Sequence, residues 1–593
     1  MERTMHVWEK CELSFTLQGT YDNPYTDIVG WVDLEGPGFK RRCYGFWNGG
    51  DEFVVRVTAT AAGQWRWTAG SEPGDSGLTA QEGSFEAIEW SEAEKAANAC
   101  RRGFLRSTDN GHAFEHADGS PCFLVGDTWW AAGTFRFPWS EGDTPDTPRT
   151  FPHYVALRVE QGYNCIALLA ALPNWNDDGL PASVDSPDGL VIRRAWGQED
   201  TGRAKAMHDE QGNTPFAFPG KVPSFEKTVP DLDCINPEFF KSLDRKVDYM
   251  NEQGIMPFIE VARRDIGQVW KKYHAWPDSY ARYVQYIWTR YQANNCLLSP
   301  IHYDYGADSI PAPDWTEACN AVVDRFGPPP FGNPLGANAH HTSLMNFGHV
   351  SQARWLTFHQ TGNARRDHYS YALLTEAFNT NPPVPVLNGE PQYEGMQFRA
   401  QADWYYGDLE LAASPSEEAA RYVRSAGYGS VLSGGLAGHI YGAGGWSGGA
   451  LWRADVEAAS KVHIWDCMTW PGAGQMQYVR SFLMSVGDRY RDLVPSIELV
   501  TPNRYGPTPG FDGWAYCAAT AARDFVLIYL EADTPETQVL SLSAKTAYRG
   551  VFFDPRTGEW SNSWDAETGA DGALQLPDKP TGSDWALKLT PMG

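Results

Sequence analysis

The sequence contains no long uninterrupted apolar stretch. None of its 593 residues lies in a run approaching the roughly 18 apolar residues that a membrane helix needs. The opening residues, MERTMHVWEKCELSF, lack the apolar core of a signal peptide. We therefore expect a soluble, cytoplasmic protein with no membrane partner. Removal of a secretion signal ahead of residue 1 would instead make the protein periplasmic or secreted.

Positive charge is also scarce. The chain has 48 Lys and Arg against 74 Asp and Glu, which gives a net charge of −26. Nucleic acids and anionic membrane surfaces are bound through clusters of Lys and Arg that neutralise phosphate groups. This charge balance therefore argues against both as partners.

Paired cysteines and metal-ligand motifs are missing as well. The ten Cys are spread singly, with no CxxC pair, which predicts reduced and mostly buried thiols instead of a disulfide framework. The sequence has no HExxH motif and no Cys/His cluster at ligand spacing. We expect no metal and no other cofactor.

Aromatic residues, in contrast, are abundant: 25 Trp, 27 Tyr and 28 Phe. Flat side chains cover the apolar C–H faces of sugars at low entropic cost, so a carbohydrate ligand is one interpretation. Large cores and β-sandwiches also use Trp, which is the alternative. The sequence leaves the oligomeric state open, with a homo-oligomer as one option.

A chain of 593 residues is longer than one hydrophobic core normally supports. Its pattern of apolar and polar residues changes twice along the sequence. Residues 1–92 and 493–593 alternate apolar and polar residues between turn clusters, which predicts two β-sandwiches. In residues 93–492, short apolar runs alternate with segments of helical spacing, such as 234–254 and 278–295. This alternation predicts a (β/α)8 TIM barrel, and so an α/β multidomain fold.

The predicted barrel strands are apolar runs that end in polar residues. They lie within residues 121–130, 162–172, 254–265, 294–306, 354–363, 383–395 and 437–445, with one more near 338–348. Catalytic groups in parallel barrels sit at the carboxyl ends of the strands, where the loops converge. We therefore searched these ends for two carboxyl groups, as cleavage of a glycosidic bond requires.

Glu390 is the first candidate, because it is the first ionisable residue after the run VPVLNG. We interpret it as the nucleophile; a structural Glu held by a neighbouring Arg is the alternative. Asp304 ends the run SPIHYDYG, and aromatic surroundings would keep its carboxyl protonated as the acid/base. Asp308 is the rival for that role.

Further polar and aromatic residues near the predicted strand ends are candidates for binding sugar. Asp127 could instead cap a following helix or turn, and single histidines are more often structural. The candidates are Asp127, Trp129, Trp130, His302, Tyr303, His341, Asn388, Tyr393, His439, Tyr441 and Trp446.

Three other functions compete with glycosidic cleavage. Residues 445–449 read GWSGG, which matches the GxSxG of serine esterases but lies in a Gly-rich loop and not at a sharp strand-to-helix turn. A polysaccharide lyase would need a local basic patch. A non-catalytic glycan-binding protein would share the aromatic cleft but lack one carboxylate.

Four motifs, GDTWW, NGEPQYEG, AGHIYGAGG and WPGAGQMQYVRSF, together resemble the apiosidase-like glycoside hydrolase barrels. The usual neighbours of that family match too: an immunoglobulin-like domain before the barrel, and a C-terminal β domain named for its similarity to a collagen-binding module of collagenases. The resemblance does not imply collagen binding.

The resemblance implies a glycoside hydrolase acting on a plant or microbial oligo- or polysaccharide. It implies Glu390 as one catalytic carboxylate and an Asp at the fourth strand end as the other. Relatives tend to show a Gly-Gly-Asp-like ending at this strand, whereas this chain reads LLSPIHYDYGAD. We expect a retaining mechanism, for which the two carboxyl groups lie about 5.5 Å apart, compared with about 6.5–9.5 Å for inversion.

Overall fold

The structure is a computed structural model of the chain. It describes residues 3–135, 137–140, 150–171, 183–185, 191–193, 208–227, 229–263, 267–303, 310–339, 341–362, 369–391, 393–394, 396–398, 409–411, 416–443, 467–503 and 513–592.

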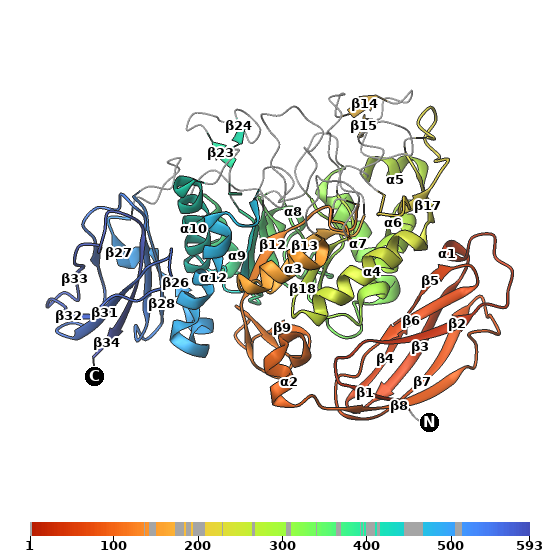
Figure 1. Ribbon diagram of the computed structural model, residues 1–593, viewed down its shortest axis with the longest axis horizontal. Coiled ribbons are helices and arrows are strands. Elements are labelled where there is room, and N and C mark those ends of the chain that lie inside the picture. The colour runs from red at the N-terminus through yellow and green to blue at the C-terminus, as the bar shows by residue number, and fades with distance from the viewer. Residues whose placement is uncertain are drawn as a thin grey trace.

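Two β-sheets form the N-terminal part of the chain, at the red end of the ribbon (Figure 1). Their apolar residues alternate along each strand, and Val32, Leu34, Val55 and Trp65 meet in a shared core. One sheet has the order β1-β8-β7-β3-β4 and the other β2-β6-β5. The strands are β1 (Arg3–His6), β2 (Cys11–Thr16), β3 (Val29–Gly36), β4 (Phe39–Tyr44), β5 (Phe46–Gly49), β6 (Glu52–Val57), β7 (Gly63–Glu72) and β8 (Glu82–Ile88).

The central part is a curled sheet with a barrel-like core, in the order β19-β18-β13-β12-β25-β22-β21-β20 among the described strands. All neighbours run parallel except β20, which is antiparallel to β21. The strands are β12 (Leu124–Thr128), β13 (Cys165–Leu169), β18 (Met256–Glu260), β19 (Leu297–Ser299), β20 (His341–Thr342), β21 (His359–Gly362), β22 (Val386–Glu390) and β25 (Gly438–Tyr441).

One predicted barrel strand needs correction. The sequence placed it near residues 338–348, but β20 is a two-residue antiparallel strand followed by helix α8 (Ser343–Phe347). The preceding segment, 334–339, is the one that runs parallel to β19, with bridges from Leu335 to Leu298 and from Ala339 to Tyr303. On its other side, Phe358 N–H donates to Leu335 O at 3.2 Å. This segment therefore lies between β19 and β21.

Helices cover the outside of the sheet (Figure 1). Their apolar faces pack against it: Phe240 and Val247 of one helix share a core with Ile166 of β13. The predicted helix at 234–254 is α4: the Asn236 side chain caps its start, and Gly254, with φ of +79°, follows its end. The longer helices are α3 (Phe151–Glu160), α4 (Pro237–Glu252), α6 (Asp278–Tyr291), α7 (Ala312–Phe326), α9 (Tyr369–Phe378), α10 (Glu417–Leu432) and α12 (Pro471–Leu483).

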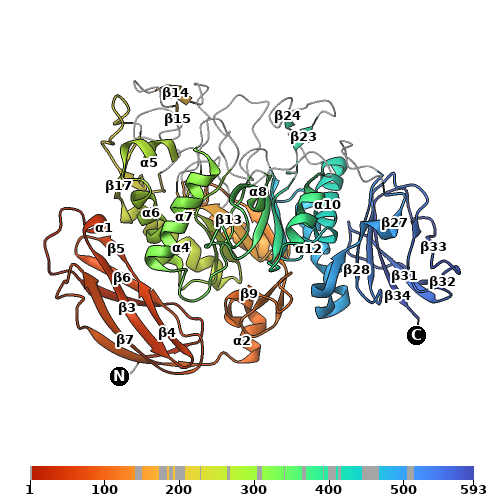
Figure 2. The ribbon, with the colours of Figure 1, turned by 180° about the vertical axis from the view of Figure 1, so that it is seen from behind.

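Short elements lie at both ends of the curled sheet. The β14/β15 and β23/β24 hairpins lie on one side of it in both views, and β9 lies on the other (Figures 1 and 2). Because β23 follows β22 in the chain, the first side carries the carboxyl ends of the strands. The remaining elements are α1 (Pro24–Asp27), α2 (Glu92–Ala97), η1 (Ala99–Arg102), β9 (Leu105–Ser107), β10 (Phe114–His116), β11 (Pro121–Cys122), β14 (Ser183–Asp185), β15 (Val191–Arg193), β16 (Phe216–Ala217), β17 (Asp231–Ile235), α5 (Gly267–Tyr273), β23 (Met396–Phe398) and β24 (Leu409–Leu411).

The C-terminal part consists of two further sheets, of order β26-β28-β29-β34-β31-β32 and β27-β30-β33. Their shared core includes Val526, Ile528, Leu587 and Leu589. The elements are η5 (Met484–Asp492), β26 (Leu493–Pro495), η6 (Ile497–Leu499), β27 (Val500–Thr501), β28 (Ala515–Thr520), β29 (Val526–Leu530), β30 (Gln538–Val539), β31 (Ala547–Phe553), β32 (Trp564–Glu567), β33 (Leu574–Gln575) and β34 (Trp585–Pro591).

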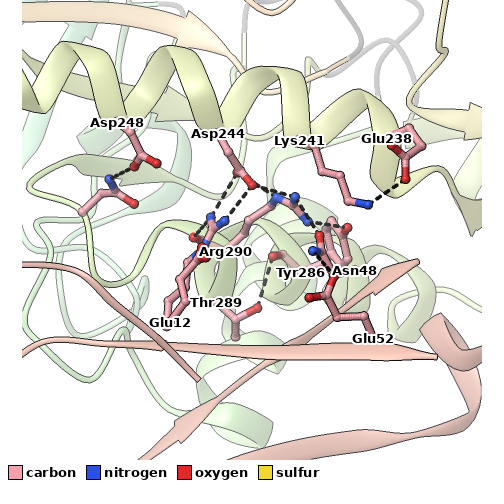
Figure 3. A network of polar contacts seen from close by, with 12 residues as sticks. Glu12, Asn48, Glu52, Glu238, Lys241, Asp244, Asp248, Tyr286, Thr289 and Arg290 are labelled. Carbon is pink, nitrogen blue, oxygen red and sulfur yellow. Dashed lines mark hydrogen bonds and ion pairs between the residues drawn. The ribbon is translucent and has the colours of Figure 1, made fainter. Parts of the chain in front are cut away.

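A buried ionic cluster joins the N-terminal sheets to the barrel helices (Figure 3). Asp244 of α4 accepts two hydrogen bonds from Arg56 of β6 and two from Arg290 of α6, at 2.7–3.0 Å. Burial alone would raise the pKa of Asp244, but the two guanidinium groups hold it well below its usual value. Lys10 adds a second link across the same interface by donating to Asp248. These contacts fasten the first two parts of the chain together.

A second buried pair joins the C-terminal sheets to α10. Arg424 donates to both carboxylate oxygens of Asp584 at 2.8 Å, and both side chains are fully buried. Tyr529 donates to the same carboxylate at 2.7 Å. Burial alone would raise the pKa of Asp584, but its hydrogen bonds and Arg424 lower it to about 2.

All ten Cys lie in the described residues, and none forms a disulfide. Nine are buried and Cys234 is half-buried, in agreement with the expected buried thiols. Within the described part of the chain, no helix combines the length and the apolar character needed to cross a membrane.

Replacing Asp244 with Asn should destabilise the protein strongly. The buried Arg290 would lose Asp244 as its counter-charge, and Arg56 would keep only the partly exposed Glu12. The loss costs about 3–5 kcal/mol of unfolding free energy. Denaturant titration measures the loss. The control is Asp565→Asn, which breaks the exposed pair with Arg549 and should leave the transition midpoint unchanged. Equal effects of the two variants would contradict the account of this interface.

The Arg424–Asp584 pair should make the stability of the protein depend on pH in the acidic range. The folded-state pKa of Asp584 lies below its usual value of 3.8, so its contribution is present above about pH 4 and is lost as the pH falls towards 2. Asp584→Asn should therefore melt below wild type at pH 7, and the difference in melting temperature should shrink between about pH 4 and 2. A difference that stays constant over this range would count against the ion pair.

Candidate functional site

The inside of the curled sheet changes from apolar to polar along the strands. Phe258 and Phe358 face each other there, with ring centroids 5.8 Å apart, and Phe114 of β10 packs below them at 5.5 Å from Phe358. Side chains two residues apart on a strand point to the same side. Glu260 and Gln360 therefore form the next layer, towards the carboxyl ends of the strands. Both are buried, with 0% and 1% of their surface exposed.

Glu390 joins this polar layer because β22 carries an irregularity. Relative to β21, the pairing register skips Gly389, which is an extra residue in β22. A bulge of this kind re-aims the side chain that follows it. On a regular strand Asn388 and Glu390, two positions apart, would point to the same side. The bulge explains why they point to different sides.

Gly389 is required at this bulge. A Cβ atom built at residue 389 would lie 1.9 Å from Nε2 of Gln360, which is far inside contact distance. The sequence motif NGE therefore has a steric cause. Only glycine lets the Gln360 amide lie directly over the backbone that precedes Glu390.

The Glu390 carboxylate is held by two neutral donors. Asn338 Nδ2 donates to Oε2 at 2.7 Å, and the Tyr393 hydroxyl donates to Oε1 at 2.8 Å. Only 4% of the Glu390 surface is exposed. The two donors fix the orientation of the carboxylate, which suits a group that must react.

Glu260, which our sequence analysis did not select, is a second carboxylate in the same layer. It ends β18, and its Oε2 contacts Nδ1 of His302, which follows β19. The His302 ring lies 4.8 Å from the Trp130 ring in an edge-to-face arrangement. The rule that selected Glu390 would also have found Glu260, because it is the first ionisable residue after the apolar run GIMPFI.

Tyr303 and His341 also lie close to this layer. The Tyr303 backbone N–H donates to Asn338 O at 2.8 Å, and its ring packs edge-on against Phe347. His341 of β20 pairs with Gly362, the β21 residue that also pairs with Glu390. Asp304, Asp308 and Trp446, together with the GWSGG segment, lie outside the described residues.

Glu394 has a structural role. Its carboxylate accepts hydrogen bonds from the backbone N–H groups of Gly472 and Ala473, at the start of α12, and from the Tyr441 hydroxyl. A helix start favours a negative charge. Even so, burial raises the pKa of Glu394. This glutamate fastens α12 to the barrel.

Asp127, a predicted sugar-binding residue, forms a buried ion pair. Its carboxylate accepts from Arg158 Nε at 2.7 Å and from the Trp129 indole at 2.5 Å, and 2% of Asp127 is exposed. Arg158 lies on α3, so Asp127 faces the helices and not the polar layer. Besides this ion pair, the carboxylate accepts a hydrogen bond from the Thr128 backbone N–H at 2.8 Å, the kind of contact that the capping alternative predicts.

Trp129, another predicted sugar-binding residue, packs into the core. It is fully buried among aromatic residues and offers no face for stacking on a sugar. Its ring neighbours are Phe137, Phe151 and Tyr154. Of the two tryptophans in GDTWW, only Trp130 is directed to the polar layer, through its contact with His302.

Asn388, His439 and Tyr441 also face the helices. Asn388 Nδ2 donates to Ser430 Oγ of α10 at 3.0 Å, and Tyr441 donates to Glu394 beside α12. His439 pairs with Asn388 on the neighbouring strand and lies near Gly427 of α10. Burial lowers the pKa of His439 to about 3. All three are predicted sugar-binding residues, and the structure places their side chains on the helix side of the strands.

One group of potential metal ligands occurs in the described residues, at Asp231, Asp233 and His274. Lys221 and Arg282 already pair with its carboxylates. The group lies on β17 and just after α5, and not at the ends of the barrel strands. Its contacts are those of a structural ionic cluster.

The family match agrees with the position of this site. Residues 108–487, from just before β10 into η5, match the family "Apiosidase-like, catalytic domain". The chain belongs to the apiosidase-like family. Residues 4–72 match a domain of unknown function, DUF5060. The apiosidase-like region makes this protein a glycosidase, as predicted, and its substrate a carbohydrate. The family match favours a glycosidase over the glycan-binding, lyase and esterase alternatives.

Solved structures share the fold. A protein of Bacteroides vulgatus ATCC 8482, provisionally described as a glycoside hydrolase, is 16% identical over 100% of both chains, with a TM-score of 0.63. A glycoside hydrolase family 5 protein of the same organism is 16% identical over 83% of this chain and 94% of its own, with a TM-score of 0.54. No curated protein sequence matches this chain.

Replacing Asp127 with Asn tests its structural role in the apiosidase-like domain. Arg158 would lose its buried counter-charge, so the unfolding free energy should fall by about 3–5 kcal/mol. The KM of the folded enzyme should stay at the wild-type value. Denaturant titration and steady-state kinetics measure the two effects. A raised KM with unchanged stability would contradict the structural role and indicate that Asp127 binds sugar.

Proposed function

We propose that this apiosidase-like protein is a retaining glycoside hydrolase that uses Glu390 as its nucleophile. The observation that carries the proposal is the geometry of this carboxylate. It is buried at the carboxyl end of β22, re-aimed by the bulge at Gly389, and held by Asn338 and Tyr393. In the reaction, Glu390 would attack the anomeric carbon and form a glycosyl-enzyme ester, which water then hydrolyses.

The barrel belongs to the same proposal. We infer a closed (β/α)8 barrel in residues 93–492, between β-sandwich domains at 1–92 and 493–593. Support comes from the 334–339 segment, which hydrogen-bonds to β19 on one side and to the residues just before β21 on the other. Closure would bring β18 and β22 to opposite sides of one interior, with Glu260 and Glu390 at its polar end.

Asp304 is the proposed acid/base, with Asp308 as its rival. Asp304 follows Tyr303, whose backbone donates to Asn338, and the Asn338 side chain holds Glu390. This link supports a place for the fourth strand end beside the nucleophile. The acid would protonate the leaving oxygen and then deprotonate the attacking water.

The family supports a carbohydrate substrate. We propose a plant or microbial oligo- or polysaccharide. Trp130, His302, Tyr303, His341 and Tyr393 remain the proposed sugar-contacting residues, because each lies in or beside the polar layer.

The test is a panel of aryl glycosides and plant oligosaccharides, assayed with wild type and three variants. Glu390→Gln should abolish cleavage while melting normally. Asp304→Asn should lose about 10²–10⁴-fold in rate, and its matched control Asp308→Asn should retain activity. Proton NMR of the sugar released first should show the same anomeric configuration as the substrate. Full activity of Glu390→Gln would refute the assignment of the nucleophile.

A further inference from the structure

Gln360 is a buried amide without a partner among the described residues. It lies on β21 with 1% of its surface exposed, and neither Oε1 nor Nε2 makes a hydrogen bond there. Gln292, another buried amide, donates to two backbone carbonyls. Leaving a buried primary amide unsatisfied costs folding free energy, and native structures avoid it except where a function or a bound molecule compensates.

The surroundings of Gln360 are shaped to keep its amide in place. Gly389 provides the room for it, since a Cβ at that position would collide with Nε2. Gly362 does the same for the Asn338 amide, because a Cβ there would lie 1.8 Å from Asn338 Oδ1. That oxygen also lacks a hydrogen-bond partner within the described part of the chain. Two glycines thus accommodate two amides beside Glu390.

The unsatisfied atoms define the chemistry of their ligand. Gln360 offers one donor atom, Nε2, beside one acceptor atom, Oε1, and Asn338 offers a second acceptor atom, Oδ1. A pair of neighbouring hydroxyl groups satisfies all three atoms, because each hydroxyl both donates and accepts. A carboxylate could only accept, so it would leave both amide oxygens unsatisfied, and it would approach the acidic side chains of Glu260 and Glu390.

We propose that Gln360, with Asn338 Oδ1, recognises two adjacent hydroxyls of an uncharged sugar unit bound at Glu390. This inference rests on the proposed function and narrows its substrate class to neutral sugars with a vicinal diol at the cleaved unit. Asn338 would couple recognition to reaction, since its Nδ2 holds the Glu390 carboxylate while its Oδ1 meets the sugar. Gln360 is thus a specificity-determining residue.

The test compares Gln360→Leu with Thr361→Val. Leu has nearly the volume of Gln but no polar atoms. Thr361 is the next residue on β21, is equally buried with an unpartnered hydroxyl among the described atoms, and faces the other side of the strand. The substrates are the 4-nitrophenyl glycoside that wild type cleaves and its mono-deoxy analogues.

Gln360→Leu should lower kcat/KM by about 10²-fold, because a site built to bind hydroxyls loses those contacts. Its melting temperature should equal or exceed that of wild type, since an unsatisfied buried amide has been removed. The variant should also stop discriminating against the deoxy analogue that wild type rejects. Thr361→Val should keep the wild-type kcat/KM and the wild-type discrimination.

Two results would overturn the inference while leaving the glycosidase intact: a wild-type kcat/KM in Gln360→Leu, or a loss of activity that is matched by a loss of melting temperature. If wild type cleaves no glycoside, the proposed function fails first. Saturation-transfer NMR with the parent monosaccharides then decides. Binding to wild type that is lost in Gln360→Leu supports the inference, and the absence of binding overturns it too.

Discussion

The burial of the Glu390 carboxylate is the constraint on which the site depends. A charge removed from water needs donors, and here Asn338 and Tyr393 provide them from separate segments of the chain. Those segments must therefore converge on the end of β22. The bulge at Gly389 and the close approach of Gln360 follow from the same requirement, because the carboxylate reaches the interior only if the strand is irregular at this point.

The same rule explains the flanking domains. Asp244 lies between Arg56 and Arg290, and Asp584 is paired with Arg424. Each interface with the barrel helices therefore contains a buried carboxylate that an arginine from the neighbouring part of the chain helps to neutralise. Removing either partner would leave an uncompensated charge. The β-rich domains are therefore integral supports of the helices that surround the site, and a domain separated from the barrel would expose or orphan these groups.

Much of this could be predicted from the sequence. Apolar runs that end in polar residues located most of the barrel strands, and the Asn-Pro start and Gly254 placed α4. Glu390 was found because it is the first ionisable residue after a buried run, and the same rule would have found Glu260. What the run does not encode is the side of the strand that each residue faces. Asp127 and Asn388 end similar runs, yet they face helices, since a shift of one position reverses a side chain. The bulge at Gly389 depends on pairing with β21, which the sequence of β22 alone does not show.

The central claim is that Glu390 forms the covalent intermediate. The most direct measurement is trapping with a 2-deoxy-2-fluoro glycoside that carries a good leaving group, followed by intact-mass and peptide mass spectrometry. The account predicts one added fluoroglycosyl group, attached to the peptide that contains Glu390. Labelling of a different carboxylate, or turnover with inversion of the anomeric configuration and no label, would contradict it.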